Sequence, residues 1–334
     1  MAKKRSSKKS SKKTKNNLHK TISFIKRALI GIAIAFAFII GLMYTSDLLS
    51  PEMKMKVKKQ ALEIKEQATP ISSTNKQVKK LADTSQKLIK ELSSSETSRK
   101  SVKIPAKMEI PQLKAKRKEQ IIKHEGYTVS YNSDHRIANW VAYQLTEEEV
   151  DNKRAERSNK FVSDPDVKGA TAMNEDYTRS GYDRGHLAPA ADMRWSIKAM
   201  YESFYLSNIC PQNSNLNRGI WNDLEVQCRM WAKDNGSVLI VTGPVITEDM
   251  KHIGKNRVAV PKAFYKVICY HTGKEYKGIG FIFENRKYKD QLGKSMATSI
   301  DQVEEITGID FFPSIPDTAE DYMEKAVDWN SWSF

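Results

Sequence analysis

Cysteine is scarce in this 334-residue chain, and the spacing of the three that occur excludes the common cysteine-based sites. Cys210, Cys228 and Cys269 form no C-x-x-C pair and no zinc-type ligand set. Two alternatives remain open, one disulfide with a third unpaired thiol or three reduced and buried side chains. Neither a disulfide scaffold nor a structural zinc centre of the usual spacing therefore explains the fold.

Acidic residues are absent from the first 27 positions, which contain 11 of the 55 lysine and arginine residues. The formal charge of the whole chain is +15, but that of the chain after residue 27 is only +4. The positive charge is therefore mainly a property of the N-terminal tail. A basic tail can bind nucleic acid or lie beside anionic lipid, and the residues that follow favour lipid.

No charged residue occurs from 28 to 46, where the sequence begins ALIGIAIAFAFIIGLMY. As a helix this run spans about 28 Å, close to the thickness of a bilayer's hydrocarbon layer. The lysines that precede it predict a single-pass anchor in the plasma (inner) membrane, with residues 1–27 in the cytoplasm and the rest periplasmic or extracellular. A cleaved signal peptide is the alternative, although the run is long for one and no A-x-A-like site follows it.

Residues 47–107 contain no aromatic residue and are rich in Lys, Ser, Thr, Gln and Glu. Such a segment cannot build a core, so it is interpreted as a solvated stalk. A short helix or weak coiled coil remains an alternative because four apolar residues lie near one helical stripe, at Val78, Leu81, Leu88 and Leu92.

From residue 108 to 334, aromatic and β-branched residues gather into strand-like runs, and we expect one α+β domain with a central, mostly antiparallel sheet flanked by helices. The predicted strands are Tyr127–Tyr131, Trp140–Tyr143, Ser237–Thr242, Ala263–Tyr270 and Ile279–Phe283. The predicted helices are Arg218–Lys233, Ser299–Thr307 and Ala319–Ala326. The continuously apolar Ser237–Thr242 suits a strand that is covered on both faces.

Two polar segments are unusual for a core domain. The first, SGYDRGHLAPAADMR at Ser180–Arg194, places Asp, Arg and His around Gly185, a residue that permits close backbone approach. The second, at Leu206–Arg229, carries five asparagines, of which Asn215 or Asn217 would begin the following helix. Glu225 and Arg229 lie one turn apart on that helix, where a simple salt bridge is the plainer interpretation.

Together these segments closely resemble the DNA/RNA non-specific endonucleases, which are ββα-metal nucleases, and among them the endonuclease G-like group. The resemblance covers residues 127–316, nearly the whole globular part. The motifs that carry it are DRGH at Asp183–His186, LSNICPQ at Leu206–Gln212, LNRGIW at Leu216–Trp221 and LE at Leu224–Glu225.

The resemblance implies a site for each motif residue. His186 resembles the general base, Asn217 the single direct protein ligand of Mg²⁺ (Mn²⁺ being the alternative ion), and Glu225 the carboxylate that orients water around the ion. Asn208 resembles the asparagine that supports the histidine. Arg184 and Arg229 would offset charge in the transition state, and Asp183 would hold the strand or Arg184. An imidazole with its usual pKa near 6.5 is neutral at pH 7 and above, as a base must be.

The implied reaction is sequence-independent hydrolysis of double- and single-stranded DNA and RNA that leaves 5′-phosphates, and the resemblance also implies that two copies can form a homodimer. Contacts to phosphate and sugar alone would make binding steeply salt-dependent. Further basic residues that could extend the surface are Lys198, Arg218, Lys255, Arg257 and Lys262. Two other functions stay open, a membrane-tethered nucleic-acid binder that does not cut and a phosphodiesterase of the same fold for small nucleotides. A mitochondrial location is a further alternative, although the tail is rich in Lys rather than Arg.

Overall fold

The computed structural model describes residues 107–334, which belong to one compact unit spanning Ser95–Phe334. The predicted basic tail (1–27), membrane anchor (28–46) and nearly all of the predicted stalk lie outside the described residues. Between residues 107 and 334, no helix is both long enough and apolar enough to span a bilayer.

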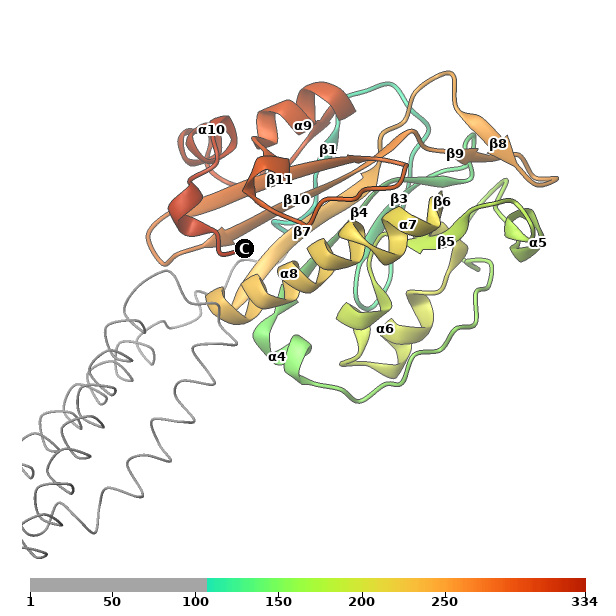
Figure 1. Ribbon diagram of the computed structural model, residues 1–334, viewed down its shortest axis with the longest axis horizontal. Helices are drawn as coiled ribbons and strands as arrows, with labels where there is room; N and C mark the ends of the chain where they lie inside the picture. Colours follow the sequence, from blue (N-terminus) through green and yellow to red (C-terminus); the bar gives the residue numbers. More distant parts are fainter. Residues whose placement is uncertain (1–106) are drawn as a thin grey trace, which may run out of the picture. The chain divides into compact units, whose positions relative to one another are not determined.

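A seven-stranded sheet forms the centre of the domain, and all of its neighbouring strands pair antiparallel (Figure 1). The strand order is β12-β11-β10-β7-β4-β3-β2. The bounds are β2 Gln120–Lys123, β3 Thr128–Asn132, β4 Ile137–Thr146, β7 Ser237–Pro244, β10 Ala263–His271, β11 Tyr276–Glu284 and β12 Ala297–Thr298. Every residue of β7 is buried, as expected for the middle strand of a sheet covered on both faces.

The two faces of this sheet support separate hydrophobic cores, because side chains alternate along each strand. On β10, Phe264 and Ile268 belong to the core that includes α8 (Ile220–Asn235). Tyr265 and Val267 belong to the other core, which α9 (Ile300–Thr307) and α10 (Asp317–Lys325) cover. Figure 1 shows α8 on one side of the sheet and α9 with α10 on the other. We call these the α8 face and the α9–α10 face.

A second, two-stranded sheet pairs β5 (Asp183–His186) with β6 (Ile209–Gln212), and α7 (Ser214–Arg218) and α8 follow directly. The other paired strands are β1 Gln112–Leu113 with β13 Ile309–Asp310, and β8 Lys251–Ile253 with β9 Val258–Val260. The remaining helices are α4 Glu147–Asp151, α5 Asn174–Tyr177 and α6 Ile197–Glu202. Short 3₁₀ turns are η1 Ala190–Met193, η2 Leu206–Asn208, η3 Lys294–Met296 and η4 Trp329–Ser331.

The structure confirms a mixed fold built on a large antiparallel sheet, and it corrects several local expectations. The helix predicted at Arg218–Lys233 corresponds to α8, which begins only at Ile220, and a short unpredicted helix, α7, ends at Arg218 on the other side of Gly219. Asn213 caps α7 through its side chain, rather than Asn215 or Asn217. A Cβ at Gly219 would lie 2.5 Å from the Asn215 carbonyl oxygen, so only glycine fits this break. All three cysteines are free and buried, which removes the disulfide alternative.

Candidate functional site

The DRGH segment forms strand β5, and Gly185 explains how it pairs so closely with β6. Gly185 lies opposite Cys210, and a Cβ on it would come within 2.2 Å of Gln212 Oε1. A side chain there would push the two strands apart. The glycine therefore allows β5 and β6 to pair closely.

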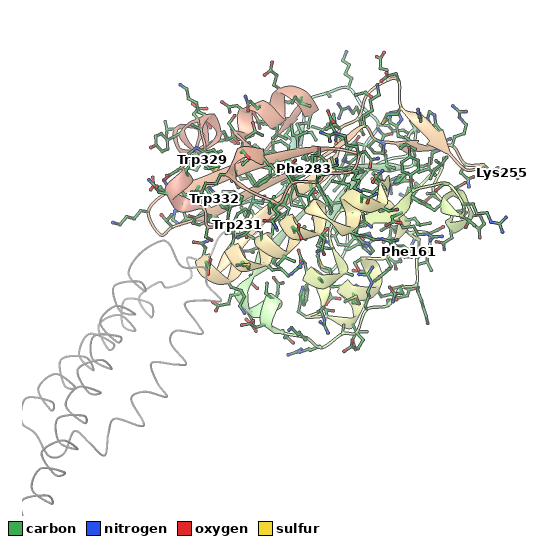
Figure 2. All side chains as sticks on the ribbon, viewed as in Figure 1. Phe161, Trp231, Lys255, Phe283, Trp329 and Trp332 are labelled. Carbon is green, nitrogen blue, oxygen red and sulfur yellow. The ribbon has the colours of Figure 1, made fainter. Side chains whose placement is uncertain are left out.

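His186 ends β5 in an apolar pocket between two phenylalanines. Its ring lies 4.8 Å from that of Phe204 and 5.4 Å from that of Phe161, which Figure 2 labels. The residue is only 8% exposed, and its buried Nε2 has no hydrogen-bond partner among the described residues. Burial, with the positive charge of Arg157 as a smaller cause, lowers the pKa of His186 to about 3. The imidazole is therefore neutral far below pH 7, rather than only above the usual pKa near 6.5.

Asn208 fixes the chain that follows His186. Its Oδ1 accepts a hydrogen bond from Ala188 N at 2.9 Å, and its Nδ2 donates to Ala188 O at 2.9 Å and Ser203 O at 2.8 Å. The side chain is completely buried, so these three bonds satisfy polar atoms that water cannot reach. Asn208 thus positions the backbone two residues after the histidine.

Asp183 begins β5 and holds residues of α7, which differs from the expected role of holding Arg184. Its carboxylate accepts hydrogen bonds from Ser214 Oγ at 3.0 Å, from Asn217 Nδ2 at 3.1 Å and from the guanidinium of Arg218 at 2.8 and 3.0 Å. Burial acts to raise the pKa of Asp183, but these hydrogen bonds, chiefly that of Arg218, hold it below its usual value. Because Asp183 engages the amide nitrogen of Asn217, the amide oxygen is directed away from that carboxylate.

Glu225 and Arg229 do not behave as a simple helical ion pair. Arg229 pairs with Asp192 at 2.6 Å, and that buried carboxylate also accepts a hydrogen bond from Tyr143 Oη at 2.8 Å. Burial raises the pKa of Glu225 to about 7, with Lys266 and Arg229 acting in the opposite direction and Asp192 adding to the rise. The ion pair with Asp192 therefore holds Arg229 in place. Glu225 is partly exposed, and with a pKa of about 7 it is ionised in about half of the molecules at neutral pH.

Two basic residues that the sequence reasoning missed influence the same groups. Lys266 is fully buried on β10, and its Nζ lies 4.8 Å from the ring centre of Trp221 without a hydrogen-bond partner among the described residues. Arg157 is exposed above the Phe204 ring, and its charge lowers the pKa values of both His186 and Glu225. Lys266 could have been noticed in the sequence, because it is a lysine inside the apolar run AFYKVICY. Arg157 lies in a long loop whose sequence has no regular hydrophobic pattern.

Arg184 lies against aromatic rings, and the other basic residues are spread along the domain. The guanidinium of Arg184 lies 5.3 Å from the Phe161 ring centre and 5.7 Å from that of Tyr177, and it donates to Asn174 O.

The five further basic residues differ in their partners. Lys198 pairs with Glu202, Arg218 with Asp183 and Lys262 with Asp249. Lys255 and Arg257 are exposed at the β8–β9 turn. Figure 2 shows Lys255 at the far end of the domain from Trp332.

The donor set at this site fits a hard divalent cation. Asn217 offers an amide oxygen whose nitrogen is already held by Asp183, and Glu225 offers a partly exposed carboxylate on the next helix. Mg²⁺ prefers oxygen ligands and keeps several waters, so a small number of protein oxygens suffices. Softer ligands do not compete, because the thiols of Cys210 and Cys228 are buried and their pKa values are raised by burial.

Comparison with known proteins identifies the family of the chain. Residues 104–318 match the family model for DNA/RNA non-specific endonucleases. The mitochondrial nuclease EXOG of Danio rerio is 38% identical over 58% of this chain and 60% of its own length, and human mitochondrial endonuclease G is 36% identical over 59% and 70%. A chain in the crystal structure of an EndoG/EndoGI complex aligns with a TM-score of 0.56 and 34% identity, over 60% of this chain and 89% of that one. The chain thus matches somewhat less than two thirds of the length of the EXOG relative.

Proposed function

Because the chain belongs to the DNA/RNA non-specific endonuclease family, we propose that residues 108–334 hydrolyse phosphodiester bonds in double- and single-stranded DNA and RNA. One observation carries this proposal. His186 lies buried with an unpartnered Nε2 at one end of β5, while Asp183 at the other end of the same strand holds the amide of Asn217. The proposed proton acceptor thus lies on β5, and the proposed cation ligand on α7 is held by the first residue of the same strand.

His186 is the general base. A neutral imidazole takes a proton from water as the water oxygen bonds to phosphorus, and the bond from phosphorus to the 3′ oxygen breaks. The products then carry a 5′-phosphate, and solvent supplies the proton for the leaving oxygen. The apolar walls formed by Phe161 and Phe204 keep the imidazole uncharged in the free protein, and the negative charge of a bound phosphate would raise its pKa so that it can accept the proton.

Mg²⁺, or Mn²⁺ in its place, would be held by Asn217, with Glu225 orienting its water shell; when bound, the ion neutralises charge on the reacting phosphate. Neighbouring residues of the chain restrain Asn217 and favour the ionised form of Glu225. Asp183 restrains the Asn217 amide, and Lys266 favours the charged form of Glu225 from below the helix that carries it. Arg184 and Arg157 add positive charge for the phosphate backbone.

Little sequence preference follows if binding depends on the phosphate backbone. The groups that surround His186 are guanidinium and aromatic side chains, which suit phosphate and sugar and need not contact base edges. Affinity should then fall steeply as salt rises. Homodimer formation is a further part of the proposal, and the molar mass of the purified protein in solution tests it.

Plasmid DNA and a structured RNA, each incubated with the purified chain and Mg²⁺, test the proposal. We expect both polymers to be degraded and EDTA to stop the reaction. Salt-sensitive retention without cleavage would favour a nucleic-acid binder, the first rival function. Faster hydrolysis of a small nucleotide ester than of plasmid would favour the second rival, a small-nucleotide phosphodiesterase.

We also propose, from the sequence, that residues 28–46 anchor the protein in the plasma (inner) membrane, with its N-terminus in the cytoplasm. The nuclease domain would then lie in the periplasm or outside the cell. Protease added to spheroplasts should digest the domain while residues 1–27 stay protected. Full protection of the domain would reverse the orientation.

A further inference from the structure

The α9–α10 face carries a cluster of carboxylates that the proposed nuclease reaction does not use. Asp301 and Glu304 lie one turn apart on α9, and Glu324 lies near the end of α10. Both helices pack on the sheet face opposite to α8 (Figure 1). We propose that these three side chains form a second divalent-cation site, selective for Ca²⁺, that stabilises the packing of α9 against α10.

The spacing of the three groups suits the size of Ca²⁺. One carboxylate oxygen from each residue lies within 4.8 Å of those of the other two. Oxygens around one Ca²⁺ ion can lie up to about 4.8 Å apart, since each Ca–O bond is about 2.4 Å, so three oxygens within this limit can share one ion. One cation can therefore contact all three oxygens with little movement, and Ca²⁺ also tolerates the irregular arrangement of ligands that two helices provide.

A second observation, the burial of Glu324, points to a ligand. Glu324 is only 5% exposed, and its Oε1 has no hydrogen-bond partner among the described residues. An unpartnered carboxylate in such a position is unfavourable unless a proton or a cation neutralises it. Glu304 is held differently, because its Oε1 accepts a hydrogen bond from Phe311 N at 2.6 Å. That bond fixes the side chain and leaves its second oxygen for an ion.

The surroundings of the cluster are strongly acidic. Glu320 and Asp310 add two more carboxylates, and the pKa of Glu320 is raised by burial and then by Asp310 and Glu304. Among the described residues, Lys114 pairs with Asp310 at 2.9 Å and is largely exposed. Burial and neighbouring carboxylates raise the pKa of Glu324 to about 9 and that of Glu304 to about 7. Ca²⁺ binding would displace these protons, so binding should release protons to the buffer.

Thermal unfolding of the full chain in detergent, titrated with CaCl₂ after EGTA treatment, tests the proposal. The parent protein carries Asn217→Ala, so that the nuclease site contributes as little Ca²⁺ binding as possible. We expect Ca²⁺ at about a hundredfold excess over Kd to raise Tm by roughly 5–10 °C. Calorimetry in buffers of different ionisation enthalpy should show that protons are released on binding.

Three variants on this background locate the effect. Glu324→Gln resembles the protonated side chain in shape, so it should fold and lose the Ca²⁺-dependent rise in Tm. Asp301→Asn, at an exposed position, should weaken Ca²⁺ binding about tenfold and provides a second variant if Glu324→Gln unfolds. Glu305→Gln, exposed on the same helix, is the matched control and should keep the full effect.

An absent Ca²⁺ effect in the Asn217→Ala parent would overturn the proposal, as would an equal effect in Glu324→Gln or Asp301→Asn. The assay measures unfolding and proton release, so its outcome does not depend on whether the domain cleaves nucleic acid. Failure of the nuclease proposal and failure of the Ca²⁺ proposal are therefore distinguishable.

Discussion

The two faces of the central sheet bury ionisable groups in opposite ways. On the α8 face, unlike charges are combined: Arg229 pairs with Asp192, and the buried Lys266 favours the ionised form of Glu225. On the α9–α10 face, like charges are combined, because burial and then neighbouring carboxylates raise the pKa values of Glu304, Glu320 and Glu324.

The difference shows what each arrangement can do. Paired unlike charges and a neutral imidazole hold their geometry without help from solution, which suits groups that must be in place before a substrate arrives. Gathered carboxylates repel one another, so this face depends on protons or a cation that pH and ion concentration control. The first face is suited to chemistry, and the second to regulation of stability.

Removal of the His186 imidazole from the α8 face should have the largest effect on activity. We expect His186→Ala to slow plasmid cleavage by about 10²- to 10⁴-fold, because the general base is lost. DNA binding should remain nearly unchanged, since the neutral ring contributes no charge. Cleavage rates on plasmid and binding to a labelled duplex at several salt concentrations measure the two effects.

The matched control for this variant is His252→Ala, which removes an exposed histidine from β8. It should cleave at the wild-type rate. Near-normal turnover in His186→Ala would contradict the assignment of the base and leave the buried imidazole with a packing role only.

Asp183→Ala probes how the α8 face holds its cation ligand. Loss of this carboxylate frees the Asn217 amide, and we expect the Mg²⁺ concentration for half-maximal cleavage to rise by about 10- to 100-fold. Arg218→Ala is the control, because it removes the exposed partner of Asp183 and keeps the carboxylate. Its effect should be less than about fivefold. Equal effects of the two variants would mean that Asp183 serves Arg218 rather than Asn217.

Much of the fold follows from local sequence patterns. The alternating or continuous apolar runs predicted the positions of β3, β4, β7, β10 and β11, with bounds that differ by a few residues. The pair β5–β6 was not expected as strands from its composition, because DRGH contains three charged or polar residues. Its close pairing depends on the absence of a Cβ at Gly185, which lies opposite Cys210 and against the Gln212 side chain. No periodicity in the sequence reveals this contact between segments about 25 residues apart.

The candidate site was predictable as a set of residues, but their interactions were not. Motif resemblance selected His186 and Asn217, whereas the usual pKa near 6.5 was wrong for the imidazole because two distant phenylalanines bury it. Arg229 was expected to have Glu225 or the substrate as its partner, and it instead pairs with Asp192, 37 positions earlier in the sequence. Long-range packing decides such partners, so a single sequence does not predict them.

The pH dependence of cleavage distinguishes the titration of Glu225 from that of His186. Glu225 has a pKa of about 7 and must be ionised to orient water, so activity at low Mg²⁺ should fall about tenfold per pH unit as pH falls below 7. Rising Mg²⁺ should move this midpoint to lower pH, since a cation favours the carboxylate. His186, with a pKa of about 3, should contribute nothing in this range.

Glu225→Gln should lower the rate and remove the slope between about pH 5.5 and 7, while Asp223→Asn, exposed on the same helix, should keep the slope. If the activity of Glu225→Gln still falls as pH falls, another group must titrate in this range, and the His186 imidazole is the first candidate. The neutral, buried state of His186 would then be wrong.

The smallest effect is expected in the pH dependence of stability, to which Glu324 on one face and His186 on the other should contribute with opposite sign. The pKa of Glu324 is about 9 in the folded protein and near the usual 4.5 when unfolded, so the folded state binds more protons between these values, and its stability falls as pH rises. His186 acts oppositely, since its folded pKa of about 3 makes stability fall as pH drops below about 6.5. Urea unfolding in EGTA at pH 7, 8 and 9 measures this effect. As pH rises, the free energy of unfolding of Glu324→Gln should fall by about 1 kcal/mol less per pH unit than that of wild type or of Glu305→Gln. If Glu324→Gln loses stability as steeply as wild type, Glu324 does not titrate in this range, and the contrast between the two faces fails on the α9–α10 side.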